Sequence, residues 1–244
     1  MRSLSLALLL LLASTAAAQS PQDVAAYDAL LLTPPGALPP IATPTMTGQV
    51  QNGAQLALRY GYVSSNNGAP GYNNIGVTGV LPMGIGATLS LTGGVSAPTS
   101  CSGCSNGLML GLGGDTRLTE MAMGTGRDGS RLTFSLNGEL GYGHQSHSNE
   151  VSGAVGVPIA LVSGGASTDM HFVPYVTPGF GFGRTEVDNP LGGTSSESGT
   201  RLMIGAGIHL FNPSSNVAFG LGVQHVAISG GQTQVGLSLI LGGH

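Results

Sequence analysis

The chain has 244 residues and a formal net charge of −4; only 7% of its residues are charged, none is lysine, and 42 are glycine. A soluble domain typically carries about 25% charged residues and about 7% glycine, so this composition excludes a soluble fold with a charged exterior. The small negative net charge and the lack of a basic patch also exclude nucleic acid as a partner.

Residues 1–19 have the three parts of a secretory signal peptide. Arg2 precedes the apolar run Leu6–Leu12, and the alanines at 16–18 form a small-residue cleavage site. Residues 20–53 predict an N-terminal arm, with a short helix that begins at Ser20 and a proline-rich extended segment over 33–45. The arm would either plug a barrel or remain a loosely ordered leader. The sequence therefore predicts an exported protein whose folded domain follows this arm.

Residues 54–244 alternate between apolar and small or polar side chains with a period of two, which predicts β-strands. The first such segment carries Leu56, Leu58, Tyr60 and Tyr62 on one face. Ten alternating segments follow one another, each close to the about 9–11 residues that a tilted membrane strand needs. No run of 18 apolar residues follows the signal peptide, so membrane-spanning helices are not expected.

Membrane barrels turn apolar side chains toward lipid and small or polar ones toward the lumen, which matches this pattern. We therefore predict an all-β fold, a transmembrane antiparallel up-and-down β-barrel of about ten strands. An eight-stranded barrel with one hairpin outside it is the alternative. Pro174 and Pro178 predict an irregular ladder in the seventh strand, because proline cannot donate a ladder hydrogen bond.

The connections between the predicted strands fall into two alternating sets. The set that contains 64–74, 97–106, 144–150, 187–199 and 229–232 is longer on average than the set that contains 81–84, 125–129, 163–168 and 211–216. Extracellular loops of such barrels are longer than periplasmic turns. The first set is therefore expected outside, with both ends of the barrel domain in the periplasm.

The signal peptide, the strand alternation over 54–242 and the loop asymmetry together resemble the small outer-membrane barrels of diderm bacteria, the OmpA-like and opacity-type surface barrels. The resemblance is architectural and rests on no fingerprint residue. It implies an outer-membrane location, contact with outer-membrane lipid, insertion by the barrel-assembly machinery and a monomeric state. The sequence departs from such barrels because it lacks tryptophan and ends Leu241-Gly242-Gly243-His244 rather than in an aromatic residue.

A few charged side chains stand among the otherwise small lumen-facing positions. A hairpin turn at 126–128 would set Asp115 directly opposite Glu139 and make Arg117 a diagonal neighbour of Glu139. Arg59 points inward by the same alternation. Charges inside a membrane barrel pair with one another, so these residues predict a lumen ion-pair network. A gate or selectivity constriction is the functional alternative, and an omptin-like catalytic use of the acid pair is a third.

The segment His144–Glu150 resembles the His-x-Ser-Asn element of outer-membrane lipid A deacylases. On that pattern His144 would be the general base, Ser146 the nucleophile and Glu150 the group that orients the histidine. Ser146 is followed by His147 and not by asparagine. A polar surface loop without catalytic residues is the alternative that we adopt, and metal binding by His144 and His147 is a further one.

Cys101 and Cys104 are the two cysteines of the chain, and in an exported protein they predict a disulfide within one loop. Free thiols, or a redox or metal role, are the alternatives. We expect neither a metal site nor a cofactor.

The function expected from the sequence is that of a non-enzymatic outer-membrane barrel, either structural and surface-exposed or a narrow pore. A lipid-modifying hydrolase that uses His144 and Ser146 is the first alternative. The second is a barrel that binds a small apolar ligand in the space that small lumen side chains leave.

Overall fold

The computed structural model describes residues 53–64, 71–83, 86–99, 106–123, 129–145, 148–163, 170–188, 193–212, 215–226 and 233–242. The predicted signal peptide, the N-terminal arm up to residue 52, the cysteines Cys101 and Cys104, and the pair Ser146 and His147 lie outside these residues. Within the described ranges, no helix is long and apolar enough to cross a membrane.

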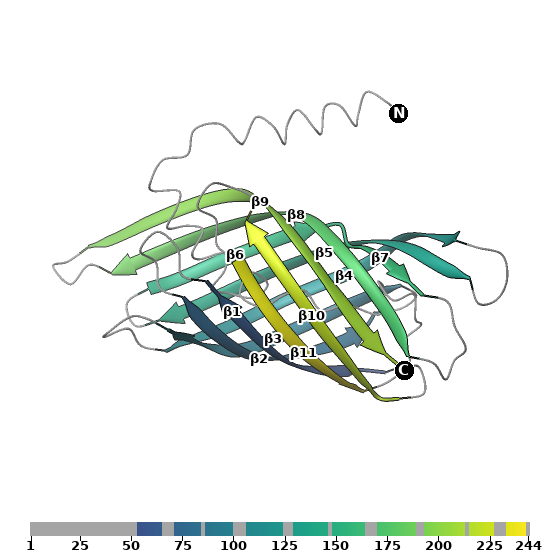
Figure 1. The fold of residues 1–244 in the computed structure, drawn as a ribbon. Coiled ribbons are helices and arrows are strands. Elements are labelled where there is room, and N and C mark those ends of the chain that lie inside the picture. The colour runs from purple at the N-terminus through teal and green to yellow at the C-terminus, as the bar shows by residue number, and fades with distance from the viewer. Residues whose placement is uncertain are drawn as a thin grey trace, which may run out of the picture.

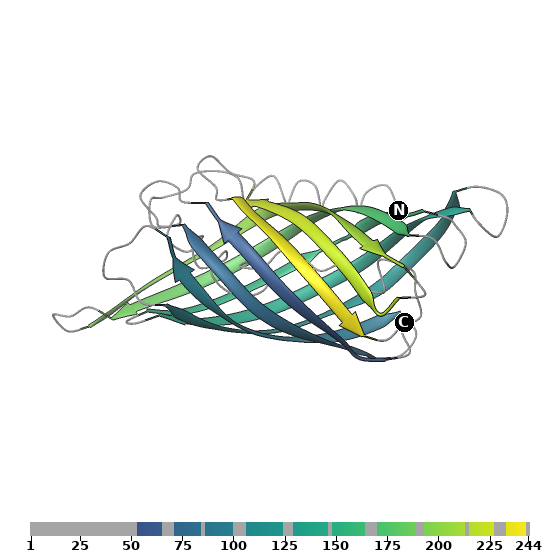
Figure 2. The same ribbon diagram turned by 60° about the horizontal axis from the view of Figure 1, so that its bottom comes forward.

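The strands form one antiparallel sheet that closes into a barrel, as Figures 1 and 2 show. Apart from β6 and β7, which both lie between β5 and β8, each strand pairs with the next along the chain, and β1 pairs with β11 to complete the ring. The strands are β1 (Gln55–Val63), β2 (Tyr72–Pro82), β3 (Ala87–Pro98), β4 (Gly107–Met123), β5 (Ser130–Gln145), β6 (Ser148–Gly156), β7 (Ile159–Val162), β8 (His171–Asp188), β9 (Thr194–Phe211), β10 (Val217–Val226) and β11 (Thr233–Gly242).

The wall of the barrel has ten strand positions, as predicted, because β6 and β7 are two pieces of one strand between β5 and β8. The register does not change across the break, since Gly156 pairs with Gly179 and Ile159 pairs with Val176. The break contains Pro158, and the carbonyl of Pro178 on β8 accepts the Val157 amide there. Two prolines without an N–H thus interrupt the ladder at one place.

The expected irregularity occurs at both prolines, although β8 itself is continuous. The pairing of β6 with β8 ends at Gly179, next to Pro178, and the pairing of β7 with β8 ends at Tyr175, next to Pro174. Pro174 lies within the continuous strand β8 and pairs with Ile208 of β9. The strand that breaks is the neighbour of β8, where a second proline meets Pro178.

The outer face of the barrel is apolar. On β1 the predicted outward residues Leu56, Leu58, Tyr60 and Tyr62 are 41–45% exposed, whereas Arg59 between them is 4% exposed. This arrangement is the inverse of a soluble barrel and matches a barrel that is solvated by lipid. Every strand contributes at least one large apolar side chain that is more than a third exposed: Leu56, Ile75, Leu91, Leu108, Leu140, Val151, Leu161, Phe172, Ile204, Phe219 and Leu237.

The connections do not show the length difference that the sequence suggested. Those on the predicted outer side span 8, 8, 2, 5 and 6 residues, and those on the other side span 4, 6, 8 and 5. The length of the outer connections was overestimated from the sequence because the strands extend into the segments that were predicted as loops. Only two residues separate β5 from β6, and β8 and β9 have 18 residues each. What distinguishes the ends is two long hairpins, β8–β9 and β4–β5, which project from opposite ends (Figures 1 and 2). Which end faces outward stays a prediction.

Candidate functional site

A cluster of three charged side chains, two buried and one half-buried, lies in the lumen of the barrel. Arg59 comes from β1 and interacts electrostatically with Glu139 of β5 and with Tyr175 of β8, and Glu139 also interacts with Asp115 of β4. Neither β5 nor β8 is a neighbour of β1, so the Arg59 interactions span the lumen and do not follow the wall. We call Arg59, Asp115 and Glu139 the waist cluster.

Neutral hydroxyls complete the surroundings of the waist cluster. The Arg59 guanidinium donates from Nη1 to Oγ1 of Thr78 over 3.4 Å. Thr88 donates its hydroxyl to Oδ1 of Asp115. Arg59 and Asp115 are 4% and 7% exposed. Buried charges are stable only when they are paired or hydrogen-bonded; Arg59 and Asp115 have hydroxyl partners here, and Arg59 is the cation that faces Glu139.

The predicted register of the β4–β5 hairpin is wrong. Asp115 pairs with Asn137, and Glu139 pairs with Gly113. Near the turn the pairing is already displaced by one residue, since Met121 pairs with Leu132, and a bulge between Arg117 and Thr119 displaces it by one more. A displacement of two residues preserves the face to which a side chain points, so Asp115 and Glu139 both remain in the lumen although they are not opposite each other.

Arg117 is not part of the waist cluster. It pairs with Ser135, four residues along β5 from Glu139, and is therefore not a diagonal neighbour of Glu139. Its Nη1 lies 3.1 Å from Oε2 of Glu120, and Arg131 Nη1 lies 3.3 Å from Oε1 of the same carboxylate. These side chains are 25–41% exposed, at the end of the barrel where the Arg117 amide donates to the carbonyl of Gly86. We call Arg117, Glu120 and Arg131 the end cluster.

Glycines make room for the large side chains of the lumen. A Cβ on Gly113 would lie 2.6 Å from Cγ of its partner Glu139, and a Cβ on Gly207 would lie 2.5 Å from Oη of its partner Tyr175. The glycine-rich lumen face is therefore occupied by a few large side chains that lie over glycines of the adjacent strand. Tyr175 was not among the residues predicted from the sequence, although its odd-numbered position between the outward-facing Phe172 and Val176 was a signal that it points inward.

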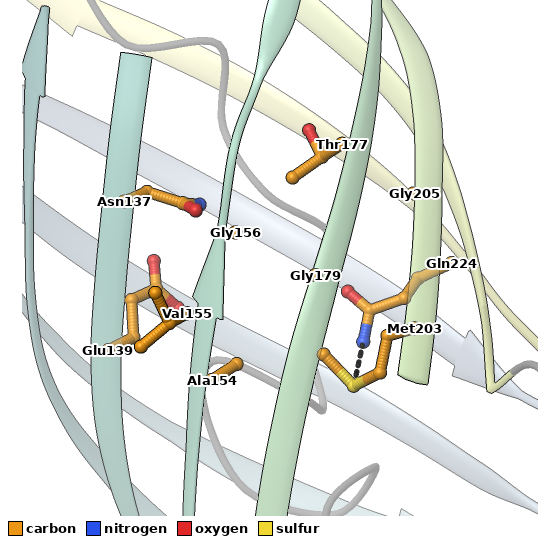
Figure 3. A pocket seen from close by; sticks show the side chains of 10 residues that line it. All are labelled: Asn137, Glu139, Ala154, Val155, Gly156, Thr177, Gly179, Met203, Gly205 and Gln224. Carbon is orange, nitrogen blue, oxygen red and sulfur yellow. Dashed lines mark hydrogen bonds between the residues drawn. The ribbon is translucent and has the colours of Figure 1, made fainter. Parts of the chain in front are cut away.

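A small cavity lies beside Glu139 in the lumen, and Figure 3 shows its lining. Its volume is about 40 Å³, which is room for only a few water molecules and far below the about 300–1,000 Å³ of a ligand pocket. Oδ1 of Asn137 and Oγ1 of Thr177 are buried there without a hydrogen-bond partner. Gln224 donates from Nε2 to Sδ of Met203 over 3.7 Å. The cavity therefore suits ordered water and is too small for the apolar ligand considered from the sequence.

A second polar group lies on the outer face, at the end where β5 and β6 are joined. Nδ1 of His144 lies 2.9 Å from Oδ1 of Asn149, and the Tyr142 hydroxyl donates to the same oxygen over 2.8 Å. Asn149 pairs directly with His144 across the hairpin. The amide of Asn149 thus orients the imidazole of His144.

Glu150 cannot orient His144, which corrects the sequence hypothesis. Because only two residues join β5 to β6, His144 pairs with Asn149 and Glu150 pairs with Gly143. Glu150 is 7% exposed and faces the lumen, whereas its neighbour Val151 is 47% exposed on the outer face. The two side chains therefore lie on opposite sides of the barrel wall. Among the described residues no group of three or more His, Cys, Asp and Glu side chains could hold a metal ion.

Comparison with known proteins finds similarity in architecture alone. No protein-family model matches the sequence, and no curated protein matches it. The solved structures that align with it include Ail, the attachment invasion locus protein of Yersinia pestis, at 11% identity over 78% of this chain and 95% of that one, with a TM-score of 0.34. The outer membrane enzyme PagL aligns at 10% identity over 77% and 99%, with a TM-score of 0.38. The N-terminal β-barrel domain of Pseudomonas aeruginosa OprF aligns at 12% identity over 77% and 96%, with a TM-score of 0.31.

These neighbours are outer-membrane β-barrels. Identities of 10–12% and TM-scores below 0.4 transfer no activity from any of them. By its own closed antiparallel sheet and apolar outer face, the chain resembles the small outer-membrane barrels in architecture.

Proposed function

We propose that the protein is an exported outer-membrane barrel without enzymatic activity, whose lumen is closed at the waist cluster. Its role would be that of a structural or surface-presenting barrel, and not that of an open diffusion pore. The observation that carries this proposal is the distribution of polarity: large apolar side chains cover the outside, and Arg59 interacts electrostatically across the inside with Glu139.

The apolar exterior supports the membrane part of the proposal. Exposed leucines, valines, isoleucines and phenylalanines on every strand would be unfavourable in water at about 25 cal/mol per Å² of apolar surface. Lipid removes this penalty, and closure of the sheet leaves no unpaired edge around the middle of the barrel.

The waist cluster supports the closed lumen. A pair that joins β1 to β5 lies across the path that a solute would take. Both side chains would lose their partner if the pair opened, and an unpaired charge inside a membrane protein is costly. The cavity beside Glu139 has room for a few waters and for nothing larger.

The test combines fractionation with bilayer recording. The full chain, expressed in a diderm host, should enter the outer-membrane fraction and migrate differently in boiled and unboiled samples. In planar bilayers the wild type should show no resolved channel, and the double variant Arg59→Ala/Glu139→Ala should show channel steps. The matched control Arg117→Ala/Glu120→Ala removes an equal pair of charges from the end cluster and should remain silent.

Soluble periplasmic protein without a mobility shift would refute the membrane barrel. Frequent large openings of the wild type would refute the closed lumen while leaving the barrel intact.

A second candidate function is a lipid-modifying hydrolase with His144 as general base. The observation that favours it is the 2.9 Å contact between His144 Nδ1 and Asn149 Oδ1, which holds the imidazole on the outer face with Nε2 free for proton transfer. Lipid composition of membranes that contain wild type or Ser146→Ala decides between the two. A difference that also depends on His144 supports the enzyme, and identical lipids exclude it.

A further inference from the structure

A groove of about 920 Å³ crosses the outer face between β5, β6, β8 and β9, at the end that carries His144. These four strands lie side by side in the sheet (Figure 1). The groove belongs to neither the waist cluster nor the cavity beside it. Its lining includes Tyr142, Asn149, Val151, Phe182, Arg184 and Glu186.

The groove changes from polar to apolar along the strands. Three successive rows of paired residues cross it: His144–Asn149–Glu186–Ser196, then Tyr142–Val151–Arg184–Ser198, then Leu140–Gly153–Phe182–Thr200. The next row, Gly138–Val155–Phe180–Leu202, has no polar side chain. A molecule that fits this surface has a polar head beside the first two rows and an apolar tail along the rest.

Arg184 gives the polar end of the groove a positive charge. Its side chain is 59% exposed, and its Nη2 lies 2.7 Å from Oε1 of Glu186, which is 43% exposed. An ion pair this exposed contributes little to stability, so a stronger acceptor can displace the carboxylate. Phosphate is such an acceptor, because a guanidinium can donate two parallel hydrogen bonds to its oxygens.

A glycine next to the groove lets the ring of Phe182 lie close to the barrel wall. A Cβ on Gly153 would lie 2.3 Å from Cζ of Phe182 and 2.9 Å from Cδ2 of Leu140. The phenyl ring of Phe182 therefore lies against the backbone of β6 instead of standing away from the wall. Phe182 and Val151 remain 40% and 47% exposed, which leaves an apolar surface next to the guanidinium.

We propose that this groove binds an anionic phospholipid of the surrounding leaflet, with the lipid phosphate on Arg184 and an acyl chain along Phe182 and the apolar row beyond it. The proposal rests on the proposed function, since it requires the outer face to meet lipid. The groove is continuous with that face, and its charge and polarity gradient match those of a lipid at the membrane surface. Tyr142 and Asn149 offer a hydroxyl and an amide to the rest of the headgroup.

The experiment titrates the full-length barrel in detergent micelles with phosphatidylglycerol and counts bound lipids by native mass spectrometry. The variant Arg184→Ala should weaken lipid binding about fivefold or more, as expected for a hydrogen-bonded charge pair. Glu186→Gln should strengthen it, because the competing carboxylate is gone. The matched control is Arg131→Ala, which removes an equally charged, exposed arginine from the end cluster and should bind as the wild type does.

Comparing boiled and unboiled samples of every variant distinguishes failure of the barrel proposal from failure of the lipid-binding proposal. Loss of the mobility shift in the wild type would refute the barrel itself. An intact shift with equal lipid binding by Arg184→Ala and Arg131→Ala would refute the groove. Full competition by inorganic phosphate at the concentration of the lipid would also refute it, because the apolar rows would then contribute nothing.

Discussion

The waist cluster and the end cluster contain the same kinds of side chain in opposite surroundings. Arg59 and Asp115 are buried, Glu139 is half-buried, and Arg59 interacts with Glu139 across the lumen, whereas Arg117, Glu120 and Arg131 form exposed ion pairs where the β4–β5 hairpin leaves the barrel. Arg117 is two residues from Asp115 and still belongs to the other cluster. The comparison shows that exposure to water, and not proximity in the sequence, decides how much each charged side chain contributes to the stability of the fold.

Arg59→Ala should have the largest effect. It leaves Glu139 in the lumen without its cation, and breaking a buried pair from one side typically costs about 3–5 kcal/mol. The free energy of unfolding, measured by urea titration in lipid vesicles with the mobility shift as the readout, should fall by about this amount. The double variant Arg59→Ala/Glu139→Ala should recover part of the loss. A single variant as stable as the wild type would show that the two charges do not interact.

The face of each waist residue was predictable from the sequence, whereas the register was not. Alternation alone places Arg59, Asp115 and Glu139 inside. The pairing of Asp115 depends on where the hairpin turns and on the bulge beside Leu118, and no glycine or proline marks that bulge in the sequence. Arg117 was misassigned because the two-residue displacement of the register pairs it with Ser135 instead of Asn137, which moves it away from Glu139.

The β5–β6 hairpin shows a similar limit of prediction from the sequence. His144 and Glu150 are close in sequence, and a longer loop between them would allow them to meet. The observed two-residue connection pairs His144 with Asn149 and turns Glu150 to the other face. A connection that is one residue longer or shorter would shift the register and turn Glu150 to the face of His144. The sequence therefore pointed to the segment that contains His144, Asn149 and Glu150 but could not show which of the last two meets the histidine.

Leu58→Arg adds an arginine on the outer face, one residue from Arg59, which stays in the lumen. Leu58 is 45% exposed, next to the buried Arg59. An arginine on the lipid face of a barrel costs about 2–4 kcal/mol near the middle of the bilayer. The same urea titration should therefore show a large loss in lipid vesicles, and Leu58→Ala serves as the control for the lost leucine. If arginine were tolerated as well as alanine, the apolar face would not meet lipid.

Gly113→Ala tests the space beneath Glu139. The added Cβ would lie 2.6 Å from Glu139 Cγ and 2.8 Å from Ser90 Oγ, so the carboxylate must shift away from its place in the waist cluster. Overpacking of this kind typically costs about 1–3 kcal/mol, and flexible neighbours favour the lower half of that range. Gly79→Ala is the matched control, because nothing lies within 4 Å of its Cβ position. Equal stability of the two variants would contradict the packing described for the lumen.

Arg117→Ala should have the smallest effect, below about 0.5 kcal/mol, because exposed ion pairs contribute little. The remaining pair between Arg131 and Glu120 keeps the carboxylate neutralised. Bilayer recordings of this variant should be as silent as those of the wild type, since Arg117 does not reach Glu139. A channel that opens on removal of Arg117 would return this residue to the waist cluster, and a loss of stability as large as that of Arg59→Ala would contradict the small contribution expected of an exposed ion pair.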